Sequence, residues 1–310
     1  MPDEPMATPA ITDGADSAAT PIARREPVRT PLYRAMNAER YSRQRLIREI
    51  QDITGGRLIC YTSGPLASLT RDDVLPLVDL LHTIPARTDI DLMLHTPGGE
   101  IDAAEKMANM VRRHVGDGGR FRVIVPDYAK SAGTLVSLVA DAIVMSESSE
   151  LGPIDPQVRL PDGQGAYAFR PAQAYVDGYE KLVELVNQNP TAIAFHRMLD
   201  KYDPTLLEVC RRAIERSTKM AEELLQRGMF RRGGNFTAVA ADLSNNKKWL
   251  QHSTPIDYLQ AKTLTLEVTY LEPTDDLWQR YWALYCHQRL AGNPDNCKLF
   301  ESDYVSIPMT

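Results

Sequence analysis

Two strand–turn–helix units between residues 90 and 157 constrain the fold of this chain more than any other feature. An apolar run over residues 90–94 ends at the turn 95–99 (HTPGG), and a helical pattern follows it. A second apolar run over 123–125 ends at the turn 127–133 (DYAKSAG), and another helical pattern follows. Parallel strands separated by helices end at the same edge of a sheet, so we expect the two glycine-bearing turns to lie side by side.

The flanking segments continue the same alternation. Strands are predicted over 58–61, 91–95, 122–125 and 142–145, and helices over 38–53, 70–82, 101–114 and 132–139. Strands that alternate with helices are typical of a parallel sheet covered by helices, so the fold class is α/β. Beyond residue 157 we predict a loop or hairpin tip at 159–164, helices over 171–188, 204–227 and 278–290, and a short helix and strand within 255–268.

The chain divides into three parts. Residues 1–31 are rich in Pro, Ala and Thr without hydrophobic periodicity, which predicts a disordered tail. Residues 32–268 form the predicted main domain, and residues 269–310 a C-terminal helical extension. The long helix 204–227 and the aromatic helix 278–290 carry more apolar surface than a small α/β domain hides alone. We therefore expect a homo-oligomer, with the aromatic helix as a candidate subunit surface.

Composition and charge exclude several classes of protein. A net charge of −6 argues against a nucleic-acid partner, because such proteins usually carry a basic balance. The 4 cysteines lack CxxC spacing, which favours reduced thiols over a metal site or a disulfide framework. No run of roughly 18 apolar residues is present, so we expect no membrane span and a cytoplasmic location.

Ser131 and the paired glycines are the candidate chemical groups. A hydroxyl is a poor nucleophile at neutral pH, so Ser131 needs a base and donors for the developing oxyanion. Gly98 and Gly99 lack side chains, so their N–H groups can approach a substrate carbonyl, and the helix dipole after Ser131 favours the same negative charge. The alternative is structural, because Pro-Gly-Gly is often only a turn and a serine before a helix is often only an N-cap.

Four motifs together resemble a known superfamily. They are HTPGG at 95–99, KSAGT at 130–134, ELGPIDPQ at 150–157 and HSTPI at 252–256. This set resembles the Clp-protease/crotonase superfamily, and within it most closely the serine dehydrogenase proteinase family, over residues 58–268. The resemblance implies a ClpP/crotonase-like spiral of ββα units with a mostly parallel sheet. It also implies a serine peptidase that needs no metal or cofactor, acts on peptide or protein substrates, and assembles into a homo-oligomer.

The resemblance also implies roles for individual residues. Ser131 is similar to the family nucleophile, Gly99 and Ala132 lie at the positions of the oxyanion-hole amides, and Gly98 shapes the turn. The chain departs from the proteolytic subunit of Clp protease at Asp155, since that subunit has its histidine base near this position. A Ser-His-Asp triad in that arrangement is therefore not available.

The general base is left open between several residues. Related membrane proteases use a Ser–Lys dyad with the lysine in a Tyr-x-Lys setting, which Tyr179-Glu180-Lys181 resembles. A lysine has an ordinary pKa of about 10.4 and accepts a proton only after burial has lowered it, and the apolar neighbours of Lys181 on its helix could supply that burial. Asp155 is either a residue that caps or turns the chain, or a catalytic group that orients a base or binds substrate, and a base that involves Asp155 or His252 is the main alternative to Lys181. His252 opens one of the family-like segments.

Other polar residues near the turns are weaker candidates. Lys130 is adjacent to Ser131, but neighbouring side chains of an extended turn diverge. His95 ends a strand, where a satisfied buried histidine is common, and Tyr128 fits a core or rim aromatic. Two other functions stay open: a crotonase-like acyl-CoA enzyme that holds a thioester enolate, and a non-catalytic assembly or binding protein that retains the fold.

Overall fold

A computed structural model describes residues 30–161, 166–291 and 295–309. The chain divides into two compact units, residues 1–38 and residues 39–310. The described part of the first unit is the short helix α1 (Pro31–Met36), whose N-cap is Thr30. The predicted disordered tail over residues 1–31 lies almost entirely outside the described residues.

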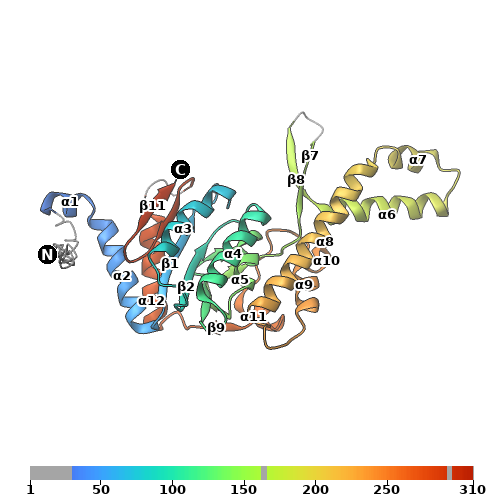
Figure 1. Cartoon of the computed structure of the whole chain (residues 1–310). Helices are drawn as coiled ribbons and strands as arrows, with labels where there is room; N and C mark the ends of the chain where they lie inside the picture. The colour runs from blue at the N-terminus through green and yellow to red at the C-terminus, as the bar shows by residue number, and fades with distance from the viewer. Residues whose placement is uncertain (1–29, 162–165, 292–294, 310) are drawn as a thin grey trace, which may run out of the picture. The chain divides into compact units, whose positions relative to one another are not determined.

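The described residues of the second unit form a seven-stranded sheet in the order β11-β10-β1-β2-β3-β5-β9 (Figure 1). Its strands are β1 (Arg57–Ser63), β2 (Ile90–His95), β3 (Phe121–Ile124), β5 (Ala142–Met145), β9 (Val268–Tyr270), β10 (Lys298–Glu301) and β11 (Ser306–Met309). The five strands from β1 to β9 run parallel, whereas β10 pairs antiparallel with β1 and with β11. The expected α/β class with a mostly parallel sheet is confirmed.

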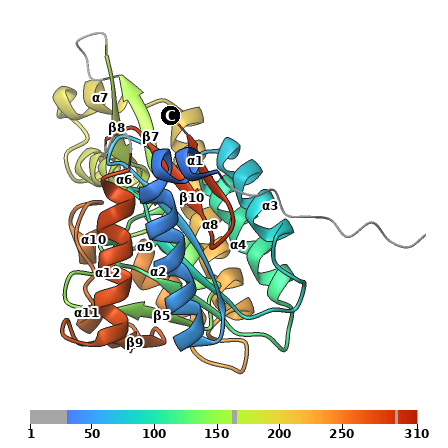
Figure 2. The ribbon, with the colours of Figure 1, turned by 90° about the vertical axis from the view of Figure 1, so that its left-hand side faces the viewer.

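Helices cover both faces of the sheet, because alternate strand residues point to opposite sides. Ile59 and Leu92 pack in the core shared with α3 (Val74–His82), α4 (Ile101–Val115), α5 (Ala132–Leu138) and α8 (Pro204–Arg227). Cys60 and Met93 pack on the other face against α2 (Ala38–Thr54) and α12 (Asp276–Arg289). Figure 2 shows α2 and α12 running alongside each other on that face.

Smaller elements connect these layers. The strands β4 (Tyr128–Ala129) and β6 (Glu150–Leu151) pair in parallel beyond the end of β3. The helices α9 (Phe236–Ser244), α10 (Asn246–Trp249) and α11 (Tyr258–Thr263) follow α8, and the short 3-10 helix η1 (Arg71–Asp73) precedes α3. No helix within the described ranges is both long and apolar enough to cross a bilayer.

Residues 157–203 form what we name the arm. It consists of the hairpin β7 (Gln157–Pro161) and β8 (Tyr167–Pro171), the helix α6 (Ala172–Gln188) and the helix α7 (Ile193–Leu199). Figure 1 shows the hairpin and the α6–α7 pair extending away from the sheet. The arm has its own small apolar cluster, in which Ala172 and Val176 of α6 meet Leu207 and Cys210 of α8.

Three differences from the sequence predictions concern the second half of the chain. The extension after residue 268 contributes α12 as expected, and also β10 and β11, which the pattern did not reveal. The expectation that the aromatic helix forms a subunit surface is wrong, because Trp278, Tyr281 and Tyr285 are buried against the sheet of their own chain. The segment 159–164, predicted as a loop or hairpin tip, begins within β7, and residues 162–165 lie outside the described residues.

Candidate active site

The turn after β2 is joined directly to the segment that leads to Ser131. The N–H of Thr96 donates to the Tyr128 carbonyl, and the N–H of Lys130 donates to the Thr96 carbonyl, each at 3.0 Å. These two bonds make a parallel bridge between Thr96 and Ala129. The two glycine-bearing turns therefore lie side by side, as the sequence predicts.

Gly99 is held on its other side by Leu69. The N–H of Leu69 donates to the Gly98 carbonyl at 2.7 Å, and the N–H of Glu100 donates to the Leu69 carbonyl at 2.9 Å. A Cβ on Gly99 would lie 2.1 Å from the Leu69 carbonyl oxygen, and its φ is +153°, so only glycine fits. In a parallel bridge the residue between the two bonded neighbours turns its own N–H to the opposite side. The exposed Gly99 N–H has no acceptor among the described residues.

Ser131 stands at the start of α5 in a strained conformation. Its φ of +50° and ψ of −112° are rare for a residue with a side chain. A Cβ on Gly98 would lie only 2.8 Å from the Ser131 Cβ, so the two turns are in direct contact. The hydroxyl does not cap the helix and makes no hydrogen bond to any described residue. The simple N-cap interpretation of this serine is therefore wrong.

Ala132 supplies a second free donor beside the first. It is the first residue of α5, and the first N–H groups of a helix have no partner within the helix. No acceptor for the Ala132 N–H is recorded among the residues that the structure describes. Ser131 thus has two backbone N–H groups near it, those of Gly99 and Ala132, which are free to donate hydrogen bonds to an anionic oxygen.

Asp155 and His252 form a hydrogen-bonded pair. His252 Nδ1 lies 2.7 Å from Asp155 Oδ1, with the aspartate side chain 3 % exposed and the histidine 29 % exposed. The second aspartate oxygen accepts a 2.9 Å hydrogen bond from Gln157 Nε2. A carboxylate in this position fixes the tautomer with the proton on Nδ1, which leaves Nε2 free to accept a proton. Both residues are candidates from the sequence, but no sequence pattern pairs them.

The chain segments on either side of this pair explain how it forms. Leu151 and Ile256 make an isolated antiparallel bridge, which brings the segments that carry Asp155 and His252 together. The segment is tied to the helix that follows Ser131, because the Gly152 N–H and the Thr134 hydroxyl of α5 are 3.0 Å apart. Ser131 and His252 make no hydrogen bond to each other. Catalytic hydrogen bonds in ligand-free enzymes are often longer than in the substrate complex.

Lys130 is occupied by a structural role. Its ammonium group forms an ion pair with Glu150 at 2.6 Å and donates to the Leu151 carbonyl at 3.1 Å. A Cβ on Gly152 would lie 2.9 Å from the Lys130 side chain, so the lysine packs along the β4–β6 pair. These contacts direct the lysine away from the role of a base for the adjacent serine.

Lys181 is exposed on α6 in the arm. The buried positions of this helix are Ala172, Val176 and Leu182, which leaves the lysine on the solvent side. The expectation that apolar neighbours bury Lys181 is wrong for the single chain, because the lysine is exposed although the adjacent Leu182 is buried. No described contact joins Lys181 to the turn of Ser131.

His95 and Tyr128 lie on the opposite face of the sheet from α5. His95 is fully buried, and its ring stacks at 4.0 Å between centroids on Tyr128 and at 4.9 Å on Tyr285 of α12. Burial is the main cause that lowers the pKa of His95 to about 3, with a smaller contribution from the charge of Arg289. The histidine is therefore neutral at physiological pH, as expected for a satisfied core residue.

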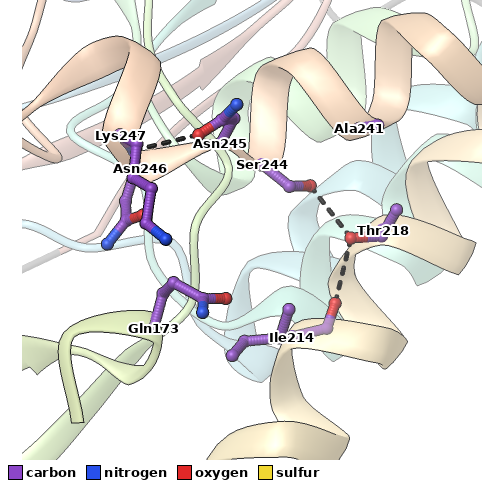
Figure 3. A pocket seen from close by; sticks show the side chains of 8 residues that line it. All are labelled: Gln173, Ile214, Thr218, Ala241, Ser244, Asn245, Asn246 and Lys247. Atoms are coloured by element: carbon purple, nitrogen blue, oxygen red, sulfur yellow. Dashed lines mark hydrogen bonds between the residues drawn. The ribbon is translucent and has the colours of Figure 1, made fainter. Parts of the chain in front are cut away.

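A pocket of about 300 Å³ opens between α6, α8 and the α9–α10 segment (Figure 3). Its lining comprises Gln173, Ile214, Thr218, Ala241, Ser244, Asn245, Asn246 and Lys247. The Thr218 hydroxyl lies 3.1 Å from the Ile214 carbonyl and 3.1 Å from the Ser244 hydroxyl. Hydroxyl and amide groups of this kind suit an uncharged polar ligand and contain no nucleophile–base pair. Within the described ranges, no three His, Cys, Asp or Glu side chains gather to hold a metal ion.

Comparison with a known family covers most of the chain. The family described as ClpP-like SDH-type serine proteinase matches residues 31–276. This range contains both glycine-bearing turns and the Asp155–His252 pair, and it stops where α12 begins. The resemblance that the sequence motifs carry is thereby confirmed.

Two uncharacterized proteins of Methanocaldococcus jannaschii are similar in sequence. One is 30% identical over 203 residues, which is 64% of this chain and 60% of the relative; the chain thus spans well under two thirds of that relative. The other is 28% identical over 236 residues, or 73% of this chain and 71% of the relative. The solved structures that match the chain include two of the 1510-N membrane-bound stomatin-specific protease. A lysine-to-alanine mutant in complex with a substrate peptide has a TM-score of 0.34 at 13% identity, covering 72% of this chain and 94% of that one. A serine-to-alanine mutant has a TM-score of 0.27 at 18% identity, covering 67% and 94%.

Proposed function

The chain belongs to the ClpP-like SDH-type serine proteinase family, and we propose that it hydrolyses peptide bonds through an acyl-enzyme on Ser131. The observation that carries the proposal is the hydroxyl of Ser131, which has no hydrogen-bond partner among the described residues. It stands in a strained turn that touches Gly98 and lies between two unpaired backbone donors. Strained residues of this kind cluster at active sites, where the surroundings hold them in place.

In the first step, the Ser131 oxygen attacks the substrate carbonyl and its proton passes to a general base. The carbonyl oxygen becomes an oxyanion that accepts hydrogen bonds from the Gly99 and Ala132 amides. Loss of one such donor costs roughly 2.7–4 kcal/mol of transition-state stabilisation. The base then donates the proton to the leaving amine, and water releases the acyl group by the reverse sequence.

We assign the base to His252, oriented by Asp155. The support is the 2.7 Å contact that leaves Nε2 of the histidine available. The Ser–Lys dyad with Lys181 is the rival assignment, and it requires a second copy of the chain to bury that lysine against the turn. Whether the chain forms a homo-oligomer therefore decides whether Lys181 can act as the base.

The proposal also includes peptide or protein substrates and a cytoplasmic location.

The test of the proposal is covalent labelling of the purified full chain by a fluorophosphonate. Wild-type protein should be labelled at Ser131, and Ser131→Ala should lose both labelling and on the order of 10³-fold or more in peptidase turnover. Ser68→Ala is the matched control, since Ser68 is exposed on the segment that leads to Leu69 beside Gly99. Equal labelling of wild type and Ser131→Ala would refute the proposal and favour a non-catalytic assembly protein.

Self-association is tested separately. The arm exposes apolar side chains, namely Tyr167, Phe169, Ile193 and Met198. Exposed apolar groups gathered on one extended segment are typical of an association surface. Light scattering at micromolar concentration should give a multiple of 34.7 kDa. A mass equal to one chain would refute the oligomer and, with it, the rival role of Lys181.

A further inference from the structure

A closed set of hydrogen bonds joins the entry to the Ser131 turn with α12. Tyr128 N lies 3.4 Å from His95 Nδ1, His95 Nε2 lies 3.5 Å from the Tyr285 hydroxyl, and that hydroxyl lies 2.6 Å from Asp127 Oδ2. The set begins at Tyr128 and ends at Asp127, which are neighbours in the chain. His95 at the end of β2 and Tyr285 on α12 thus hold the neighbouring residues Asp127 and Tyr128.

The directions of these bonds follow from the chemistry of each group. The Tyr128 N–H can only donate, so His95 Nδ1 accepts and the ring proton lies on Nε2. Nε2–H then donates to the Tyr285 oxygen, and the Tyr285 O–H donates to the Asp127 carboxylate. Every donor in the set has an acceptor, and the 2.6 Å bond to a carboxylate is in the range of a strong charge-assisted bond. The two bonds to His95 are long, so the carboxylate end is the stronger link.

Two members of this set, Asp127 and Tyr128, lie four and three residues before the strained Ser131. Ser131 keeps its positive φ only if the segments around it are fixed. After Tyr128 the chain is held by the Thr96–Ala129 bridge and by the β4–β6 pair. Before that point, the Glu150 N–H donates to the Asp127 carbonyl at 2.6 Å and the Ser148 hydroxyl donates to the Pro126 carbonyl at 2.9 Å. The side-chain restraint there comes from the contacts of Asp127 and Tyr128 with the buried His95 and Tyr285.

The helix that supplies Tyr285 lies outside the shared family region. The family match ends at residue 276, and α12 is Asp276–Arg289. The proposed catalytic residues all lie within the match, as do His95 and Asp127, whereas Tyr285 does not. The helix packs on the face of the sheet opposite α5, so Tyr285 reaches the turn from behind.

We propose that Tyr285, with His95 and Asp127, is a positioning group that holds the Ser131 turn in its reactive conformation. The C-terminal helix is then part of the active-site architecture and not only a cover for the sheet. The inference rests on the proposed role of Ser131 as nucleophile. None of the three side chains is assigned contact with substrate.

The experiment compares two tyrosines on the same buried face of α12. Tyr285→Phe removes the hydroxyl that joins His95 to Asp127, whereas Tyr281→Phe removes a buried hydroxyl that has no hydrogen-bond partner among the described residues. A misplacement of about 1 Å in an active site costs about 100-fold in rate, and loss of one restraint among several should cost about tenfold. We expect Tyr285→Phe to slow the maximal rate of fluorophosphonate labelling by about tenfold. The half-saturating probe concentration should stay constant, and Tyr281→Phe should label like wild type.

A second pair of variants acts on the half-exposed end of the set, where folding is at less risk. Asp127→Ala removes the acceptor of the Tyr285 hydroxyl, whereas Asp127→Asn retains an acceptor oxygen. We expect Asp127→Ala to match Tyr285→Phe in labelling rate and Asp127→Asn to recover much of the loss. The double variant Tyr285→Phe, Asp127→Ala should be no slower than the slower single one, because both break the same link.

The outcomes separate this inference from the proposed function. If wild type is not labelled at Ser131, the proposed function fails. If wild type is labelled and Tyr285→Phe reacts at the rate of Tyr281→Phe, only the positioning role is overturned. A lowered melting temperature for Tyr285→Phe with an unchanged labelling rate likewise overturns it, since a purely structural role predicts that result. Additive losses in the double variant would do the same.

Discussion

The sheet edge that carries Ser131 and the arm that carries Lys181 are built in opposite ways. All seven residues of α5 are buried, and both turns beside it are fixed by backbone hydrogen bonds on two sides. In the arm, α7 has no buried residue, and α6 buries only Ala172, Val176 and Leu182. The chain alone therefore fixes the Ser131 turn and the neighbouring Gly99 turn, whereas the arm presents most of its side chains outward.

This contrast separates the two candidate bases. His252 is held by a buried carboxylate on segments that a β-bridge brings together, so its position is determined within one chain. Lys181 is on the outward side of a helix whose few apolar contacts face α8. A base of the first kind works in any assembly state, and one of the second kind works only after association.

The largest expected effect comes from breaking the core pair. His252→Ala should reduce the labelling rate and peptidase turnover by about 10²- to 10⁴-fold, the range that a general base contributes. Asp155→Asn should also lower the rate, because the amide can hold the imidazole in the wrong tautomer. Lys181→Met is the matched variant in the arm and should leave the rate unchanged.

Steady-state kinetics at several pH values check this prediction. A normal rate for His252→Ala together with a large loss for Lys181→Met would reverse the assignment of the base. It would also indicate that the arm completes the site. A loss in both variants would indicate that both groups act in the assembled protein.

A smaller effect is expected from the backbone of the turn. Gly98→Ala requires a Cβ at a φ of +104°, only 2.8 Å from the Ser131 Cβ and 2.9 Å from the Lys130 carbonyl. The unfavourable φ alone costs about 1–3 kcal/mol in the free energy of unfolding, and the clash moves the nucleophile. Gly233→Ala is matched in φ, at +108°, but its Cβ meets open space.

We therefore expect both glycine variants to lose similar stability from the φ penalty, with only Gly98→Ala losing labelling at Ser131. Chemical denaturation and probe labelling on the same samples provide the two measurements. Equal labelling of Gly98→Ala and Gly233→Ala would contradict the close contact between the turns.

The smallest effect concerns the pH dependence of stability. Burial lowers the pKa of His95 from its ordinary 6.5 to about 3, so the unfolded chain binds a proton that the folded chain does not. Stability should fall as the pH drops below about 6.5, by up to about 1.4 kcal/mol per pH unit. Burial raises the pKa of Asp127, whose contribution has the opposite sign and appears at lower pH.

The free energy of unfolding, measured with denaturant from about pH 5 to about pH 6.5, reports the contribution of His95. His95→Asn should flatten the pH dependence in this window. His196→Asn, in the exposed helix α7, should leave the dependence as in wild type. A slope that is the same in all three proteins would contradict the burial of a neutral His95.

The sequence by itself determined the α/β class, the mostly parallel sheet, and the juxtaposition of the Gly98–Gly99 and Ser131 turns. Those features depend on local periodicity, on turn chemistry and on the rule that parallel strands end at one edge. The motif resemblance also identified the family. The assignment of Gly99 and Ala132 as oxyanion donors stays a prediction, which depends on the neighbours of each residue along the chain.

Tertiary structure decided the rest. Asp155 and His252 are 97 residues apart in sequence and meet through a β-bridge that no local pattern encodes. The apolar neighbours of Lys181 did not bury it, because helix orientation and not composition selects which side faces the core. The aromatic stripe of α12 fits a subunit surface equally well in sequence, and only the packing against β1 and β2 showed that Tyr285 reaches His95 from behind the active site. Such long-range contacts depend on how elements pack in three dimensions, which the periodicity of one element does not contain.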